Sequence, residues 1–304
     1  MVGVGHPVRP RVILRLLDTD VTLPYVREDL QLFWSPVPGF HGTFMGKTVT
    51  INQLGVRGPE VEEGKITGRK RIVCFGDSIT FGYGVDDDDS YPRRLSHALG
   101  AEVINAGVTG YSSFQALGLA RRLLPRLAPD VGMLLIGWND GNHRPVDDRE
   151  YGRRVEAAAR LEAWGDHLYV YRLFRNVYLR WTLLQGLSRA KGTPKQHRVS
   201  PEQYAENLDA FARECATRGT TPVFVALPRR RRLGEPPPDP TYPRTLEETA
   251  ARLEVPLLTV GVLSAQEGEG NDRFFLDTLH LTPEGNERLA ALLAGQLESL
   301  GLGP

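Results

Sequence analysis

Residues 72–80 read Ile72-Val73-Cys74-Phe75-Gly76-Asp77-Ser78-Ile79-Thr80, and this stretch decides the fold. The apolar run at its start predicts a short strand that is buried on both faces, as in a parallel sheet. Residues 81–84, which contain two glycines, predict a turn, and a helical pattern follows from about Ser90. Ser78 therefore stands at the carboxyl end of a strand, where open α/β sheets present their reactive groups.

From Arg71 onward, strand-like and helix-like segments alternate. The expected strands are residues 72–75, 102–105, 131–136, 222–227 and 256–260, and the expected helices are residues 90–99, 112–127, 201–218, 243–253 and 283–300. This alternation predicts an α/β fold in which helices cover both faces of a five-stranded parallel sheet. Right-handed crossovers would place the carboxyl ends of all five strands along one edge.

Two further regions differ from this pattern. Residues 1–68 are rich in Pro, Gly and aromatic side chains, and residues 48–52 alternate like a strand, so we expect a small β-rich N-terminal extension packed on the main domain, residues 69–304. Residues 141–199 form a helical insertion without a strand signal. At its centre, residues 168–184 carry apolar side chains on one face of an amphipathic helix. This helix could pack on the domain, form a lid over the site, or dock on a membrane surface or a partner.

Composition excludes several classes of protein. The chain carries 37 basic and 37 acidic side chains, so no net charge favours nucleic acid or an anionic membrane as a partner. Its two cysteines, Cys74 and Cys215, argue against a disulfide scaffold and suit a reducing compartment. No stretch has the length and apolar character of a membrane span, and residues 1–10 lack the apolar core of a secretion signal. We therefore expect a cytoplasmic protein, with secretion of a trimmed form as the open alternative.

A serine nucleophile needs a general base, and that base needs an orienting partner. Residues 277–285 read Asp-Thr-Leu-His-Leu-Thr-Pro-Glu-Gly, so Asp277 and His280 are three positions apart and can face the same side of a turn. The carboxylate could then accept a hydrogen bond from Nδ1 of His280 and leave Nε2 to take a proton from Ser78. Thr282 followed by Pro283 predicts the start of a helix, which places this pair on the loop just before it.

Attack on an acyl carbonyl also requires donors aimed at the developing oxyanion. Gly110, in the loop after the second expected strand, could offer a backbone N–H close to the start of the next helix. Asn139, after the third expected strand, could offer its side-chain amide. Either residue could equally serve only its own turn.

Other residues are weaker candidates. Trp138 and Tyr83 could form the walls of a substrate pocket, and His143 could line its mouth, although packing or a solvated loop explains each of them as well. The acidic run 86–89 lacks the alternating ligand spacing of a calcium loop, and the basic run 229–232 could attract an anionic substrate or simply be an exposed loop. The sequence contains no cysteine and histidine pattern for zinc and no phosphate-binding loop, so we expect no metal.

Taken together, four segments resemble the sequence blocks of the SGNH hydrolases, also called GDSL esterases and lipases. The resemblance covers roughly residues 70–300 and follows the order of the family. It rests on Gly-Asp-Ser-Ile-Thr around Ser78, Asn-Ala-Gly-Val-Thr-Gly ending at Gly110, Gly-Trp-Asn-Asp around Asn139, and Asp-Thr-Leu-His at 277–280. It implies a three-layer α/β/α sandwich of the SGNH, flavodoxin-like type.

The resemblance also implies a role for each of these residues. Ser78 would be the nucleophile and, through its own N–H, the first oxyanion donor. Gly110 and Asn139 would complete the oxyanion hole, His280 would be the base, and Asp277 would orient it.

We therefore expect an esterase or lipase that cleaves a carboxylic ester of a small molecule, lipid or carbohydrate, without a metal or organic cofactor. Two alternatives stay open. One is an O-acyltransferase or deacetylase that acts at the same site on a sugar or other small alcohol; transfer would need an acceptor site and exclusion of water, which residues 141–199 could provide. The other is a non-catalytic carbohydrate- or lipid-binding module, against which the complete set of site residues argues.

Overall fold

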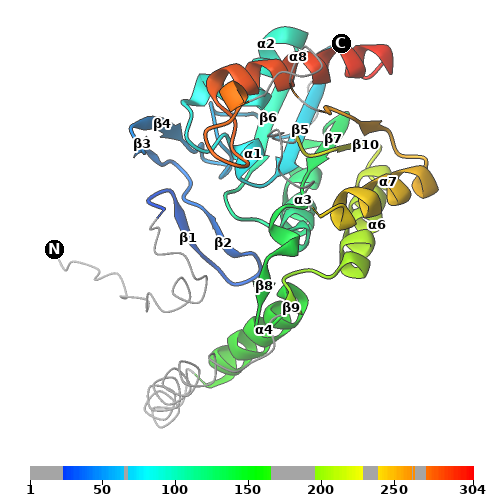
Figure 1. The fold of residues 1–304 in the computed structure, drawn as a ribbon. Helices are drawn as coiled ribbons and strands as arrows, with labels where there is room; N and C mark the ends of the chain where they lie inside the picture. Colours follow the sequence, from blue (N-terminus) through cyan, green and yellow to red (C-terminus); the bar gives the residue numbers. More distant parts are fainter. Residues whose placement is uncertain (1–22, 65–67, 166–195, 229–238, 262, 264–271) are drawn as a thin grey trace, which may run out of the picture.

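A five-stranded parallel sheet forms the centre of the molecule (Figure 1). The computed structural model describes residues 23–64, 68–165, 196–228, 239–261, 263 and 272–304. The strands are β5 (Arg71–Gly76), β6 (Glu102–Gly107), β7 (Val131–Leu135), β10 (Thr221–Val225) and β11 (Leu257–Leu258), in the order β11-β10-β7-β5-β6. All neighbouring strands are parallel, which confirms the predicted sheet. The last strand is shorter than expected, because only Leu257 and Leu258 pair with β10.

The strand order places a topological switch point between β5 and β7. The chain passes from β5 to β6 on one side and then returns to β7 on the other side of β5. In flavodoxin-like sheets of this order, ligands bind beyond the carboxyl ends of the two strands at the switch point. Those ends are Gly76, two residues before Ser78, and Leu135, four residues before Asn139.

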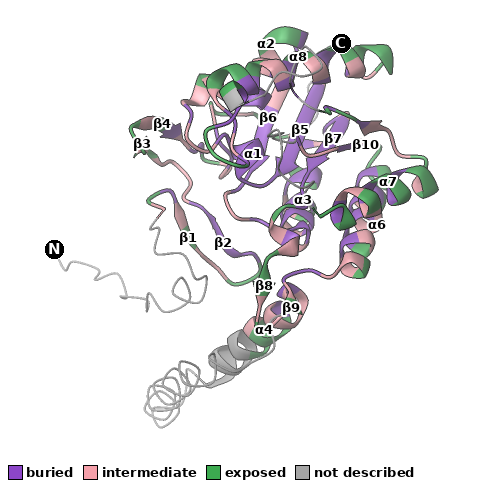
Figure 2. Cartoon of the chain, viewed as in Figure 1, coloured by how far each residue is buried: buried purple, intermediate pink, exposed green. Residues whose placement is uncertain are grey.

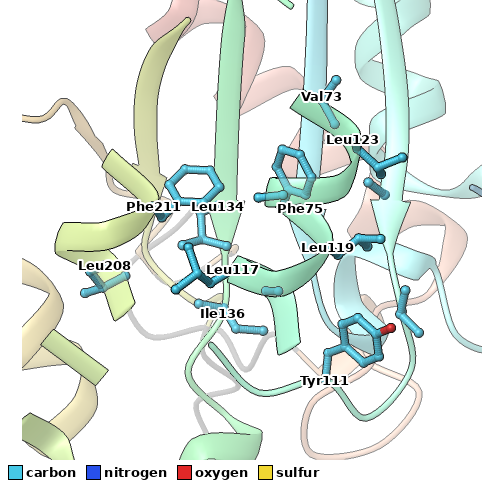
Figure 3. Close-up of a cluster of buried hydrophobic side chains, with 14 of the residues drawn as sticks. Val73, Phe75, Tyr111, Leu117, Leu119, Leu123, Leu134, Ile136, Leu208 and Phe211 are labelled. Carbon is cyan, nitrogen blue, oxygen red and sulfur yellow. The ribbon is translucent and has the colours of Figure 1, made fainter. Parts of the chain in front are cut away.

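Helices cover both faces of the sheet, as the sequence predicts. On one face lie α3 (Ser113–Leu127), α6 (Pro201–Ala216) and α7 (Thr241–Leu253); on the other lie α2 (Tyr91–Leu99) and α8 (Pro283–Ser299). Successive side chains of β5 alternate between the two cores, because side chains of a strand point to opposite faces. Val73 and Phe75 pack against leucines of α3 (Figure 3), whereas Ile72 and Cys74 pack on the opposite side. Figure 2 shows these central strands buried and the outer faces of the helices exposed.

Local sequence signals set the beginnings of the main helices. Ser112 and Gln115 form a reciprocal capping box at α3, and Ser200 and Gln203 form one at α6. Thr282 accepts a hydrogen bond from the Gly285 N–H at the start of α8, with Pro283 as the first helical residue, as predicted. Short 3₁₀ helices lie at Asp87–Asp89 (η2), Asn139–Gly141 (η3) and Asp272–Phe274 (η4).

The described part of the N-terminal extension begins with two β-hairpins. Strand β1 (Val26–Asp29) pairs with β2 (Phe33–Pro36), and β3 (His41–Phe44) pairs with β4 (Lys47–Thr50), both antiparallel. The buried guanidinium of Arg57 donates hydrogen bonds to the carbonyl oxygens of Phe81 and Gly82 at 2.8 and 2.6 Å. The residues that follow the hairpins are thus anchored directly to the segment after Ser78.

The described parts of the insertion begin and end with a short antiparallel pair, β8 (His143–Arg144) and β9 (Gln196–His197). Between them, α4 (Asp148–Gly165) projects away from the sheet layers in Figure 1. The expected amphipathic helix at 168–184 lies outside the described residues. None of the helices in the described part of the chain combines the length and apolar character that crossing a bilayer requires.

Candidate active site

Ser78 is the first residue of α1 (Ser78–Phe81), which begins directly beyond the end of β5. Asp77 caps this turn, because its Oδ1 accepts a hydrogen bond from the Ile79 N–H at 2.9 Å. A Cβ atom on Gly76 would collide with Thr80 Oγ1 and with the carbonyl oxygen of Leu135. Glycine at position 76 therefore allows the helical turn that carries Ser78 to pack tightly against the end of the sheet.

The loop before α8 brings a histidine and a carboxylate to Ser78. The Nε2 atom of His280 lies 2.8 Å from Ser78 Oγ, and its Nδ1 lies 2.7 Å from Asp277 Oδ2. The other carboxylate oxygen of Asp277 accepts the N–H groups of Leu279 and His280, each at 2.8 Å. These bonds close the loop into a fixed turn, so the three side chains form one continuous hydrogen-bonded chain.

The ionisation state of Asp277 fits its place in this hydrogen-bonded chain. Partial burial opposes ionisation of its carboxyl, but the hydrogen bonds from the His280 side chain and from the two backbone N–H groups outweigh that effect and lower its pKa. Asp277 is therefore a carboxylate at neutral pH. A carboxylate on Nδ1 fixes the tautomer in which Nε2 can accept a proton, and it stabilises the imidazolium that results.

Backbone N–H groups at the two neighbouring strand ends complete the polar surroundings. Among the described residues, neither the N–H of Ser78 nor that of Gly110 has a hydrogen-bond acceptor. Gly110 has a φ of +80°, a left-handed conformation that favours glycine, and the Val108 N–H ties this loop to Gly76 O at 3.1 Å. Unpaired N–H groups held on a rigid scaffold are the groups that stabilise an oxyanion.

The side-chain amide of Asn139 lies at the end of β7, in η3. Its Nδ2 donates to the carbonyl oxygen of Tyr111 at 3.0 Å and lies 3.4 Å from Asp77 Oδ2. The first contact ties Asn139 to the loop of Gly110, and the second is a long hydrogen bond to the residue before Ser78.

Two buried carboxyls lie behind these groups and were missed by sequence reasoning. Burial raises the pKa of Asp77 to about 7 and that of Asp140 to about 6. Asp140 accepts hydrogen bonds from the hydroxyl and N–H of Ser113 at the start of α3, which link the loop after β7 to the one after β6. Their positions directly beside Ser78 and Asn139 are the only sequence signal that points to them.

Of the weaker candidates, Tyr83 and Trp138 lie beside the site, whereas His143 lies at the base of the insertion. Tyr83 lies against the imidazole of His280, with ring centroids 4.4 Å apart. Trp138 is 43% exposed next to Asn139, so its indole is accessible beside the site. His143 instead lies on β8, with its ring tilted against that of His197 at a centroid distance of 4.6 Å, a contact that belongs to the base of the insertion.

The charged runs have structural partners where they are described. All four residues of the acidic run 86–89 form ion pairs, with Lys47, Arg57, Arg93 and Arg94 in chain order. The run 229–232 lies outside the described residues. In the ranges that the structure describes, no group of three or more histidine, cysteine or acidic side chains could hold a metal ion.

The family model of the GDSL-like lipase/acylhydrolase family matches residues 74–288. An arylesterase of Vibrio mimicus is 30% identical over 77 residues, which are 24% of this chain and 38% of that protein, well under two thirds of its length. Among solved structures, a lipase/acylhydrolase from Enterococcus faecalis is 20% identical with a TM-score of 0.48, covering 76% of this chain and 97% of that one. The psychrotrophic esterase EstA from Pseudoalteromonas sp., inhibited by monoethylphosphonate, is 14% identical with a TM-score of 0.48, covering 76% and 98%.

Proposed function

The chain belongs to the GDSL-like lipase/acylhydrolase family, and from this premise we propose that it cleaves a carboxylic ester through an acyl-enzyme on Ser78. The observation that carries the proposal is the continuous chain from Asp277 through His280 to Ser78, with contacts of 2.7 and 2.8 Å. Nucleophile, base and orienting carboxylate within hydrogen-bond reach are the arrangement that activates a serine hydroxyl.

In the first half of the proposed reaction, Ser78 Oγ attacks the carbonyl carbon of the ester while its proton passes to His280 Nε2. The carbonyl π electrons move onto the oxygen, and the N–H groups of Ser78 and Gly110 and the amide of Asn139 stabilise that oxyanion. When the tetrahedral intermediate collapses, the bond to the alcohol oxygen breaks. The departing alcohol takes the proton from His280 and leaves the acyl group on Ser78.

In the second half, water attacks the acyl carbon and gives a proton to His280. The new tetrahedral intermediate expels Ser78 Oγ, which recovers that proton, and the carboxylic acid leaves. Asp277 keeps its negative charge throughout and stabilises the imidazolium in both halves.

The rim of the site supports an apolar group on the substrate. Two large hydrophobic side chains of the described residues, Trp138 at 43% and Leu276 at 49% exposure, are the immediate chain neighbours of Asn139 and Asp277. Exposed apolar side chains beside polar groups that could hold a carbonyl are typical of a ligand site. We therefore propose an ester with an apolar acyl or alcohol part.

The test is hydrolysis of p-nitrophenyl esters from acetate to palmitate by the unmodified protein, Ser78→Ala and Ser96→Ala. Ser96 is a suitable control because its hydroxyl binds the carbonyl oxygen of Ala101, at the far end of α2. We expect hydrolysis to be lost in Ser78→Ala only. Full activity of Ser78→Ala would contradict the proposal. The same reactions with an added alcohol acceptor measure acyl transfer directly, because transfer yields the ester of that alcohol.

A further inference from the structure

Three consecutive carbonyl oxygens in the loop after β6, those of residues 109–111, each accept a hydrogen bond from a side chain. The donors are Trp34 Nε1 at 3.0 Å, Arg198 Nη1 at 2.6 Å and Asn139 Nδ2 at 3.0 Å, in that order. They come from the N-terminal extension, from the end of the insertion and from the loop after β7. The loop that carries the Gly110 N–H is therefore held by three separate parts of the chain.

The first of these bonds, from Trp34, orients the peptide group whose N–H is the proposed oxyanion donor. The carbonyl oxygen of Thr109 and the N–H of Gly110 belong to the same peptide unit. This unit is planar and trans, so its C=O and N–H point in opposite directions. A donor that fixes the direction of the oxygen thereby fixes the direction of the N–H. It also polarises the peptide and makes its N–H a better donor, because linked hydrogen bonds strengthen one another.

Trp34 is itself held firmly enough to act in this way. Its side chain is buried, and its carbonyl oxygen accepts a hydrogen bond from the Tyr111 hydroxyl at 2.7 Å. The guanidinium of Arg198 lies over the indole ring, 5.4 Å from the ring centroid. A Cβ atom on Gly110 would lie 3.3 Å from Cζ2 of the indole, so the ring packs directly against the glycine.

We propose that Trp34 is a positioning residue for ester cleavage, whose indole N–H sets the direction of the Gly110 N–H toward the oxyanion. This inference rests on the proposed function, in which Gly110 is an oxyanion donor. It makes the N-terminal extension part of the machinery of the reaction. In this proposal Trp34 acts through the peptide between residues 109 and 110 and not by contact with the substrate.

The test is Trp34→Phe, which removes the donor and keeps an aromatic ring in the core. The matched control is Phe33→Leu, the neighbouring residue of β2. Its buried ring packs on Phe114 and Tyr151 and lies 6.4 Å from the Trp34 ring, but none of its ring contacts with the described residues reaches the loop at 109–111. We expect Trp34→Phe to lower kcat about tenfold, less than the about 10²-fold or more that follows removal of an oxyanion donor, with KM changed less than about twofold. Phe33→Leu should change kcat less than about twofold.

A transition-state analogue separates positioning from general loss of structure. A trifluoromethyl ketone forms an oxyanion when it adds to the nucleophile, so its affinity should fall by the same factor as kcat in Trp34→Phe. Replacement of Trp34 by benzothienylalanine, which keeps the shape of the indole without its N–H, should reproduce both losses. The pH profile of kcat/KM should be unchanged, because Asp277 and His280 are untouched.

The outcomes distinguish this inference from the proposed function. If the Trp34 variants keep full kcat and full affinity for the ketone while Ser78→Ala is inactive, the positioning role is wrong and the proposed function stands. If Phe33→Leu loses as much kcat as Trp34→Phe, the effect is one of packing and the positioning role is again wrong. If the unmodified protein hydrolyses no ester and binds no ketone, the proposed function fails, and the role of Trp34 fails with it.

Discussion

Replacing Asp77 by Asn should change how the stability of the protein depends on pH. The carboxyl of Asp77 is fully buried beside Ser78, and this burial raises its pKa from 3.8 to about 7. The hydrogen bond from the Ile79 N–H acts in the opposite direction, and the charge of Asp140 adds to the increase. Asparagine has nearly the same shape and can still accept that hydrogen bond, but it cannot ionise.

The sign follows from the number of protons bound by each state. Between pH 3.8 and about 7 the folded protein keeps the proton on Asp77 while the unfolded chain releases it, so the free energy of unfolding falls as pH rises through this range. About three pH units at about 1.4 kcal/mol each give about 4 kcal/mol. The free energy of unfolding of Asp77→Asn, minus that of the unmodified protein, should therefore grow by a few kcal/mol between about pH 4 and about pH 8.

Urea unfolding of both proteins across this range measures the difference, and the titrations of groups that do not interact with Asp77 cancel. Asp29→Asn is the matched control. Partial burial opposes ionisation of Asp29, but its hydrogen bonds, first of all that from Arg122, lower the pKa of its carboxyl to about 2. Asp29 is therefore ionised in both states above about pH 5, and its difference curve should be flat there. A flat curve for Asp77→Asn would contradict this prediction, because it would mean that Asp77 ionises as easily in the folded protein as in the unfolded chain.

Three further predictions concern the site itself. His280→Ala should lower kcat about 10⁶-fold and Asp277→Asn about 10⁴-fold, because the carboxylate only orients and stabilises the imidazole; equal losses in ester hydrolysis would contradict that division. Asn139→Ala should lower kcat about 10²- to 10³-fold with little change in KM, as measured by steady-state kinetics; a rise in KM alone would indicate a substrate-binding role. Gly110→Ala should lower the free energy of unfolding by about 1–2 kcal/mol, because its φ of +80° disfavours a side chain, and should also lower kcat through the contact of its Cβ with Trp34. Urea unfolding and kinetics check both effects, and unchanged values would count against the tight packing of this loop.

The sheet could be predicted from the sequence because its strands carry strong local signals. Residues 72–75 are apolar on both faces, and the structure buries them between two layers of helices. The start of α8 at Pro283 could also be predicted, because Thr282 is a typical N-cap and proline is favoured at the first helical position. The length of β11 could not be predicted, because it depends on how many of its residues pair with β10, a partner that is distant in the sequence.

Some contacts of the candidate site could likewise be predicted from the sequence, and others could not. Asp277 and His280 are close in sequence, and parallel strands carry Ser78 to the same edge, so elementary rules bring these three side chains together. Trp34 and the loop of Gly110 are about 75 residues apart, and no periodicity connects a hairpin to a loop of the sheet. The same limit applies to the ring contact of His143 with His197, which depends on how the ends of the insertion pair.

The most direct test of the account is covalent labelling by a fluorophosphonate, with the modified residue identified by mass spectrometry of the digested protein. The account predicts one label per chain, located on Ser78, absent from Ser78→Ala and strongly slowed in His280→Ala. Ser96→Ala, whose missing hydroxyl lies at the end of α2, should be labelled as fast as the unmodified protein. A label on any other residue, or labelling of Ser78 at an undiminished rate without His280, would contradict the claim that these two residues form an activated nucleophile.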